Sequence, residues 1–202
     1  MKILVKTINA YSFSELDETA RQEAKNNVAL KVREPVLFSE DLREVLREDL
    51  GLYYLRTYYS LSHCQGDGLC LYGIITFEEL FDNLKFRKIA FKGIHHKQIQ
   101  SISNELQYID FKHKGRYYYA NSVYIGSCEN NPTDRQEAII EKVIKNVKSW
   151  YFSFCKEWEN RGYEYFYEIF DEDMELICSE YDYLFTENGE LIDDKGYLEL
   201  TA

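Results

Sequence analysis

The strongest constraint on the fold is a long apolar stripe in the second half of the chain. Apolar residues recur there every three or four positions, which is the spacing of one face of an α-helix. The stripe comprises Ile140, Val143, Ile144, Val147, Tyr151, Phe154 and Trp158. Thr133 and Gln136 form a capping-box pattern just after Pro132. We therefore expect a helix that runs to about Arg161 and breaks at Gly162, and it must bury its stripe against another layer.

Pairs of β-rich runs predict that this layer is an antiparallel sheet. Residues 53–62 (YYLRTYYSLS) and 69–75 (LCLYGII) flank the motif QGDG, which consists of Gln65, Gly66, Asp67 and Gly68. Asp and Gly tolerate the positive φ angles of a tight turn, so the motif predicts a hairpin. Lys114-Gly115 and Asn188-Gly189 predict two further hairpins in the same way.

Shorter helices are expected to pack on the sheet. Leu16, Ala20, Ala24 and Val28 follow at spacings of four and predict a helix over 15–33. A second apolar stripe covers 38–50, with Ser39 as its N-cap and Gly51 as its C-terminal turn. Thr76 and Glu79 form a capping box for a short helix over 77–84. Residues 2–8 predict an opening strand, and residues 86–127 predict mainly strands.

Together these patterns predict an α+β fold, in which an antiparallel sheet packs against helices and one long helix occupies the C-terminal half. The 202 residues fit a single domain over 1–202, with an acidic C-terminal subregion at 157–199. No signal-peptide pattern and no apolar run of membrane-spanning length occurs, so a cytoplasmic location in the host cell and no membrane partner are expected. The cysteines are scattered without a C-x-x-C spacing, which predicts reduced thiols and no zinc site; they are Cys64, Cys70, Cys128, Cys155 and Cys178.

The charges divide the chain. The net charge is −11, yet residues 157–199 hold fifteen acidic side chains against two basic ones. Residues 85–116 hold eight basic side chains against two acidic ones. A basic middle and a strongly acidic end indicate charged partners, because fields of this kind attract surfaces of the opposite sign.

The order of the motifs resembles a family of small phage and prophage proteins. The chain has F-x-E-L-x-x-x-A from Phe13 to Ala20, then QGDG, a long helix, and Y-x-F-T-x-x-G from Tyr183 to Gly189. The family shares the strand motif S-x-S-Q-G-D-G-A-S-F-x-G. This chain keeps Gly73 but has Leu-Cys-Leu at 69–71 where the family has Ala-Ser-Phe. The resemblance implies an accessory protein of a mobile genetic element and implies no mechanism.

The QGDG motif has a structural and a catalytic interpretation. In the first, Gln65 and Asp67 satisfy backbone groups at the turn. In the second, Asp67 and His63 form the acid–base pair of a small nuclease acting on RNA or DNA. His63 and Cys64 are neighbours, and neighbours in a strand point to opposite faces, so a direct Cys/His pair is not expected. A phosphate-binding loop is excluded because a strand follows the glycines where such loops require a helix.

The histidines and the basic middle are further candidates. His95, His96 and His113 with Asp110 lack the spacing of a metal site, so no metal and no cofactor is expected. Residues 85–97 (KFRKIAFKGIHHK) interleave basic and aromatic side chains, as proteins that bind single strands do, and 116–124 (RYYYANSVY) add tyrosines. Nucleic-acid contact through 85–116 is one hypothesis, and a solvated strand face is the other.

The acidic end carries the main functional hypothesis. Helical spacing predicts that several carboxylates lie along one side of a helix; they are Glu164, Glu168, Asp171, Glu172 and Glu175. Ordered carboxylates can take the place of phosphates in a basic channel, and aromatic residues between them can anchor the contact. We therefore expect an inhibitor of a host nucleic-acid enzyme, such as a Cas effector or another defence nuclease. The alternatives are the small nuclease, an antitoxin that neutralises a basic toxin, and an acidic face that serves only solubility.

Overall fold

The computed structural model describes residues 9–33 and 35–192, and it confirms the α+β class. The chain divides into two compact units, one formed by 35–162 and the other by the segments 1–34 and 163–202. We call the first the sheet unit and the second the acidic unit. The single domain expected from the sequence stays a prediction, because the two units are defined by packing and not by independent folding.

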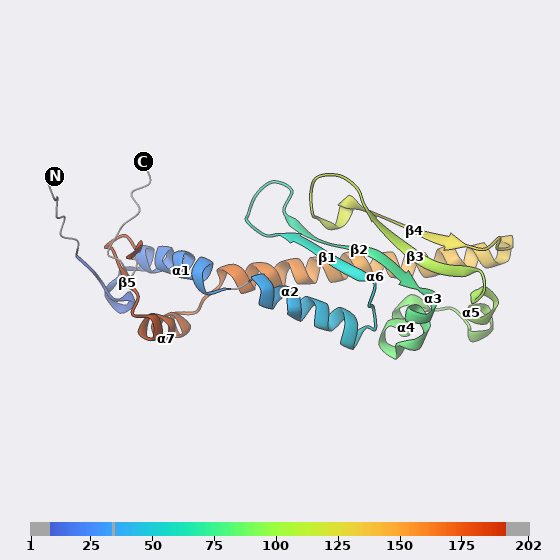
Figure 1. Ribbon diagram of the computed structural model, residues 1–202, viewed down its shortest axis with the longest axis horizontal. Coiled ribbons are helices and arrows are strands. Elements are labelled where there is room, and N and C mark those ends of the chain that lie inside the picture. The colour runs from blue at the N-terminus through green and yellow to red at the C-terminus, as the bar shows by residue number, and fades with distance from the viewer. Residues whose placement is uncertain (1–8, 34, 193–202) are drawn as a thin grey trace, which may run out of the picture. The chain divides into compact units, whose positions relative to one another are not determined.

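The sheet unit contains a four-stranded antiparallel sheet in the order β1-β2-β3-β4 (Figure 1). Its strands are β1 (Leu55–Ser60), β2 (Gly68–Thr76), β3 (Leu106–His113) and β4 (Val123–Glu129). Two of the expected hairpins are confirmed, since β1 pairs with β2 across the QGDG turn and β3 pairs with β4 across the loop that contains Lys114 and Gly115. Each strand is adjacent in the sheet to its neighbour in sequence; loops join β1 to β2 and β3 to β4, whereas α3, α4 and α5 lie between β2 and β3.

Helices cover one face of this sheet. They are α2 (Pro35–Glu44), α3 (Phe77–Asp82), α4 (Leu84–Ala90), α5 (His96–Ile102) and α6 (Asp134–Tyr167), with a π-helical turn, η2, at Val45–Asp49. Figure 1 shows α6 running behind the sheet, and the ring of Tyr151 lies 5.5 Å from that of Phe111 in β3. Phe38 of α2 packs edge-on against Tyr59 of β1 at 5.2 Å. The apolar stripe of the long helix therefore packs against the sheet, as the sequence predicts.

The prediction of mainly strands over 86–127 is wrong for residues 86–102. Residues 84–90 and 96–102 form α4 and α5. The side chain of Asn83 caps α4 by accepting hydrogen bonds from the backbone N–H groups of Lys85 and Phe86, at 2.9 and 3.0 Å. Phe86 and Ala90, four residues apart, are buried. The caps and the spacing of four outweigh the β propensity of the aromatic residues here.

Ser39 does not cap α2, which begins at Pro35. The Ser39 hydroxyl lies inside the helix and donates to the Pro35 carbonyl at 2.8 Å. Pro35 itself suits the first helical position, since its missing N–H has no partner to lose there. The expected end at Gly51 is confirmed, because Gly51 has φ +66° and its N–H donates to the Arg47 carbonyl at 3.0 Å.

Gly162 does not break the long helix, and this prediction is also wrong. The helix α6 continues to Tyr167. A Cβ atom at Gly162 would come within 2.3 Å of a Leu61 methyl group and 3.0 Å of the Phe38 ring. The glycine therefore provides space for two side chains to pack against the helix backbone, and that packing gain opposes the low helix propensity of glycine.

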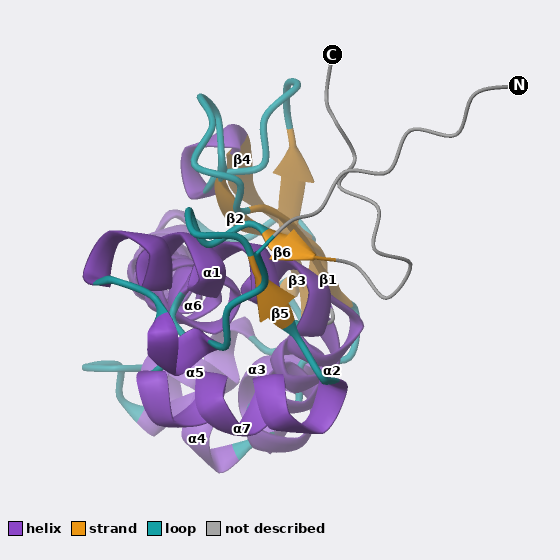
Figure 2. Ribbon diagram, turned by 90° about the vertical axis from the view of Figure 1, so that its left-hand side faces the viewer, coloured by secondary structure: helices purple, strands orange, loops and turns teal. Residues whose placement is uncertain are grey.

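The acidic unit is built on α1 (Glu18–Val32) and α7 (Asp171–Tyr181), with the short hairpin β5 (Leu184–Phe185) and β6 (Leu191–Ile192) seen in Figure 2. A short 3-10 turn at Phe13–Glu15 precedes α1, and Asp17 caps α1 by accepting from the Ala20 N–H at 2.8 Å. The helix expected over 15–33 is thus confirmed to within a turn. The expected opening strand at 2–8 lies outside the described residues.

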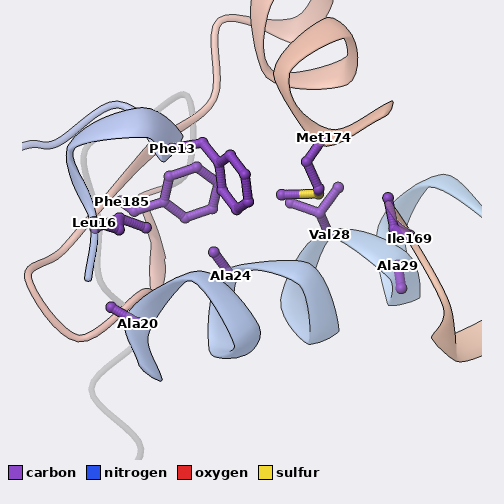
Figure 3. Close-up of a cluster of buried hydrophobic side chains, with 9 residues drawn as sticks. All are labelled: Phe13, Leu16, Ala20, Ala24, Val28, Ala29, Ile169, Met174 and Phe185. Carbon is purple, nitrogen blue, oxygen red and sulfur yellow. The ribbon is translucent and has the colours of Figure 1, made fainter. Parts of the chain in front are cut away.

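A compact apolar cluster holds the acidic unit together (Figure 3). It consists of Phe13, Leu16, Ala20, Ala24, Val28, Ala29, Ile169, Met174 and Phe185. The hairpin expected at Asn188-Gly189 is confirmed and packs on α1, where a Cβ atom at Gly189 would lie 2.1 Å from the Ala20 carbonyl oxygen. Gly189 has φ +83°, so the turn requires a glycine for both space and conformation.

Candidate functional site

Asp67 organises the QGDG turn. One of its carboxylate oxygens accepts a hydrogen bond from the Ser60 hydroxyl at 2.6 Å. The other accepts from the backbone N–H groups of Ser62 and Cys64, at 2.6 and 2.7 Å. The Asp67 N–H closes the turn by donating to the Cys64 carbonyl at 3.2 Å. A single carboxylate thus satisfies two backbone N–H groups and one hydroxyl in the loop between β1 and β2, as short Asp side chains do in Asx turns.

The electrostatics of Asp67 agree with this role. Partial burial by itself raises the pKa of the carboxyl group, but the hydrogen bonds from Ser60, Cys64 and Ser62 and the nearby His63 outweigh it, so the pKa lies below its ordinary value. A general base works best when its pKa lies near the operating pH. The geometry supports the structural interpretation of QGDG, and the acid–base pair of His63 and Asp67 stays an untested hypothesis.

The glycines of the motif bring the turn against the other hairpin. Gly66 and Gly68 have φ +92° and +150°. A Cβ atom at Gly66 would lie 2.1 Å from the Tyr117 ring, and one at Gly68 would lie 2.8 Å from the Cβ atom of Tyr119. The QGDG loop and the 114–122 loop therefore pack closely at one end of the sheet.

The histidines considered as metal ligands are not brought together. His95 is the N-cap residue of α5, and its backbone N–H donates to the Gln98 side chain at 3.1 Å. His96 is the first residue of the helix. His113 ends β3, and Asp110 pairs with Lys112 at 2.6 Å on the same strand. Within the described parts of the chain, no group of three or more His, Cys, Asp or Glu side chains is placed to hold a metal ion.

The acidic candidates are divided between two helices, and only Asp171, Glu172 and Glu175 share one. Glu164 lies on α6, Glu168 lies just beyond its end, and a new helix, α7, starts at Asp171. Asp171 forms an ion pair with Lys25 of α1 and is used within the unit. Ile169, buried between the two helices, explains the break, because it turns the chain into the apolar cluster of Figure 3.

The exposed side of α7 nevertheless combines carboxylates with apolar side chains. Phe170 is 72% exposed and Leu176 is 69% exposed. The exposed acidic residues around them on this helix are Asp171, Glu172, Asp173, Glu175 and Glu180. Glu172 and Glu180 stand four residues before and after Leu176, so they flank it on the same side of the helix. We call this surface the α7 face.

The two units differ in their net charge. Residues 35–162 hold seventeen acidic and seventeen basic side chains, so the sheet unit is neutral. Residues 1–34 and 163–202 hold eighteen acidic and seven basic side chains, so the whole net charge of −11 belongs to the acidic unit. The two surfaces are thus suited to different partners.

The outer face of the sheet, which is the face opposite the buried side chains of Ile75, Ile109 and Phe111, carries a set of tyrosines that the sequence reasoning mostly missed. Strand alternation and register place one on each strand on this face; they are Tyr58, Tyr72, Tyr108 and Tyr124. The basic side chains of Arg56 and Lys112 lie on it as well. The alternation of Arg56 and Tyr58 in the sequence was the available signal, since both positions of such a pair face the same side of a strand.

The chain matches no protein-family model, no curated protein and no solved structure. In the described residues, no helix has both the length and the apolar composition that crossing a bilayer requires.

Proposed function

We propose that the protein acts by binding and inhibits a nucleic-acid enzyme, with the α7 face of the acidic unit occupying the basic channel that otherwise holds nucleic acid. The resemblance to phage proteins directs this proposal to host defence nucleases, Cas effectors among them. An antitoxin that neutralises a basic toxin would use the same face, and the two differ only in the identity of the basic partner.

The observation that carries the proposal is the exposure of Leu176 on α7 and of Phe170 at the N-cap of this helix, both among carboxylates. A solvated helix face made only for solubility has no need of two large apolar side chains that are more than two-thirds exposed. At a protein interface, an apolar anchor supplies affinity and the surrounding charges supply the association rate.

The support beneath the α7 face favours the same conclusion. Met174 and Ile169 fix α7 and its N-terminal flank in the apolar cluster, and Lys25 holds Asp171 from α1. A phosphate-mimicking surface must be ordered before it binds, because ordering a flexible acidic segment on binding would consume binding free energy.

The test is inhibition of purified defence nucleases, with nucleic-acid cleavage as the readout. We expect inhibition of a target nuclease that competes with its nucleic acid and weakens as salt rises from 50 to about 200 mM, because salt screens exposed charges. Glu175→Lys combined with Glu180→Lys should abolish it. Both positions lie beyond the first turn of α7, so the reversal opposes no stabilising helix-dipole contact.

The matched control is Glu187→Lys combined with Glu190→Lys. It makes the same change in net charge, in the same unit, at two exposed positions on the β5–β6 turn. Inhibition that survives in the control and disappears in the α7 variant supports the α7 face. Equal inhibition by the α7 variant and the unchanged protein would refute it, and cleavage by the protein alone would favour the nuclease.

A further inference from the structure

A cleft at the β1 edge of the outer sheet face is lined by three arginines. It has a volume of about 450 Å³, and its lining includes Arg43, Arg47 and Arg56. Arg43 and Arg47 are four residues apart across α2 and η2, so they project on the same side. No Asp or Glu side chain lines the cleft. In the described chain, none of the three guanidinium groups has an ion-pair partner.

Two contacts position the chain at this cleft. The Tyr53 N–H donates to a carboxylate oxygen of Glu79 at 2.6 Å, while the other oxygen accepts from the Thr76 N–H at 2.9 Å. At Gly73, a Cβ atom would come within 2.2 Å of the Tyr54 carbonyl oxygen. Glu79 and Gly73 therefore hold Tyr53 and Tyr54 in place, and both tyrosines line the cleft and are more than half exposed.

A cluster of aromatic rings continues from the cleft across the sheet. Tyr72 lines the cleft and stacks on Tyr58 with ring centres 4.3 Å apart and planes 11° apart. Tyr58 in turn contacts Tyr118 at 5.0 Å, and Tyr118 stacks on His113 at 5.5 Å. Tyr58 and Tyr118 are 41% and 38% exposed, so aromatic ring surface faces solvent beside the arginines.

The combination matches the chemistry of a single-stranded polynucleotide. Guanidinium groups bind phosphates in a forked geometry, and bases stack on exposed aromatic rings. The cleft also offers the hydroxyl groups of Tyr53, Tyr54 and Thr57, which can accept a hydrogen bond as well as donate one. A ribose 2′-OH both donates and accepts, and these hydroxyls can match both roles, whereas arginine can only donate.

We propose that the outer sheet face and its arginine cleft bind single-stranded RNA, with phosphates in the cleft and bases on the Tyr72–Tyr58–Tyr118 rings. The site lies wholly in the neutral sheet unit, so it is independent of the α7 face. It also differs from the basic segment over 85–116 that the sequence indicated, much of which forms α4 and α5.

The experiment measures the fluorescence anisotropy of a labelled U12 RNA with the full chain as a function of salt. Three phosphate contacts predict a log–log salt slope of about −2, so affinity should fall about 20-fold between 50 and 200 mM salt. Arg43→Gln combined with Arg47→Gln should weaken binding at least about tenfold at low salt and reduce the slope to below about 1 in magnitude. Lys88→Gln combined with Lys97→Gln removes the same charge from α4 and α5 and should leave both quantities nearly unchanged.

The ring contribution is tested separately with Tyr58. Tyr58→Phe keeps a stacking surface and should bind like the unchanged protein, whereas Tyr58→Leu should lose about tenfold. The folded state of each variant is checked by its circular dichroism. Absence of U12 binding at low salt, or equal loss in the arginine and lysine pairs, would overturn the proposal. Tighter binding of dT12 or of duplex RNA than of U12 would overturn the assignment to single-stranded RNA.

Discussion

Removal of the Asp67 carboxylate should measurably destabilise the sheet unit. Asp67→Ala deletes three hydrogen bonds, from the Ser60 hydroxyl and from the N–H groups of Ser62 and Cys64. The Ser60 contact is partly buried, so its loss should cost about 1 kcal/mol. The two N–H groups are exposed and recover hydrogen bonds to water, so each should contribute about 0.5 kcal/mol. The expected decrease in the free energy of unfolding is therefore about 2 kcal/mol.

Urea unfolding followed by circular dichroism measures this decrease. With a slope of about 2 kcal/mol per molar urea, the midpoint should move down by about 1 M. Asp67→Asn is the matched variant, since it keeps one oxygen acceptor and the size of the side chain. It should fall between Asp67→Ala and the unchanged protein. Ligand-binding function should decrease only in proportion to the folded fraction.

The same variant makes a prediction about pH. Because the pKa of Asp67 is lower in the folded protein than in the unfolded chain, its contribution is complete above the unfolded value of about 4 and disappears as the pH falls through the folded value. The stability difference between Asp67→Ala and the unchanged protein should therefore persist at pH 5 to 8 and shrink below about pH 4. An Asp67→Ala protein that is equally stable but has lost activity would refute the structural role and support the nuclease.

Two further predictions concern packing and thiol burial. Gly73→Ala should lower the free energy of unfolding by more than about 2 kcal/mol, because φ is +124° and the new Cβ would meet the Tyr54 carbonyl. Gly126→Ala, at a strand position with ordinary φ, should lower it less. Equal urea midpoints for the two variants would contradict this prediction. Cys64 is exposed, whereas burial raises the pKa of the Cys155 thiol to about 12. A thiol reagent at pH 8 should therefore label Cys64 first. Rapid labelling of Cys155, detected by mass spectrometry, would show that the core opens.

The features that could be predicted from the sequence are those in which one or two residues decide a local geometry. The turns at Gly51 and Gly189 were predicted because a positive φ requires glycine, and both glycines have it. The capping box of Thr76 and Glu79 was predicted because its two hydrogen bonds form within four residues, and both are present. Signals of this kind depend little on the rest of the chain.

The features that could not be predicted depend on distant parts of the chain. A glycine near the end of a helical pattern usually indicates the end of the helix. At Gly162, however, the side chains of Phe38 and Leu61, more than 100 residues earlier, occupy the space that a Cβ atom would fill. The helices α4 and α5 have seven residues each, too few for the helical period to outweigh their aromatic and β-branched content. Tertiary packing decided the first case against local propensity, and end caps such as that of Asn83 decided the second.

The arginine cleft shows the same limit for a site. Arg43 and Arg47 come from a helical segment, Arg56 from the first strand, and Tyr72 from the second, so no window of the sequence contains the site. Two buried or close contacts assemble it: Glu79 through the Tyr53 N–H, and Gly73 through the Tyr54 carbonyl. Glu79 is only 8% exposed although it carries a carboxylate, and both of its oxygens accept hydrogen bonds. A residue recognisable as a helix cap therefore also positions the chain at the cleft, and only the long-range contact with Tyr53 reveals this second role.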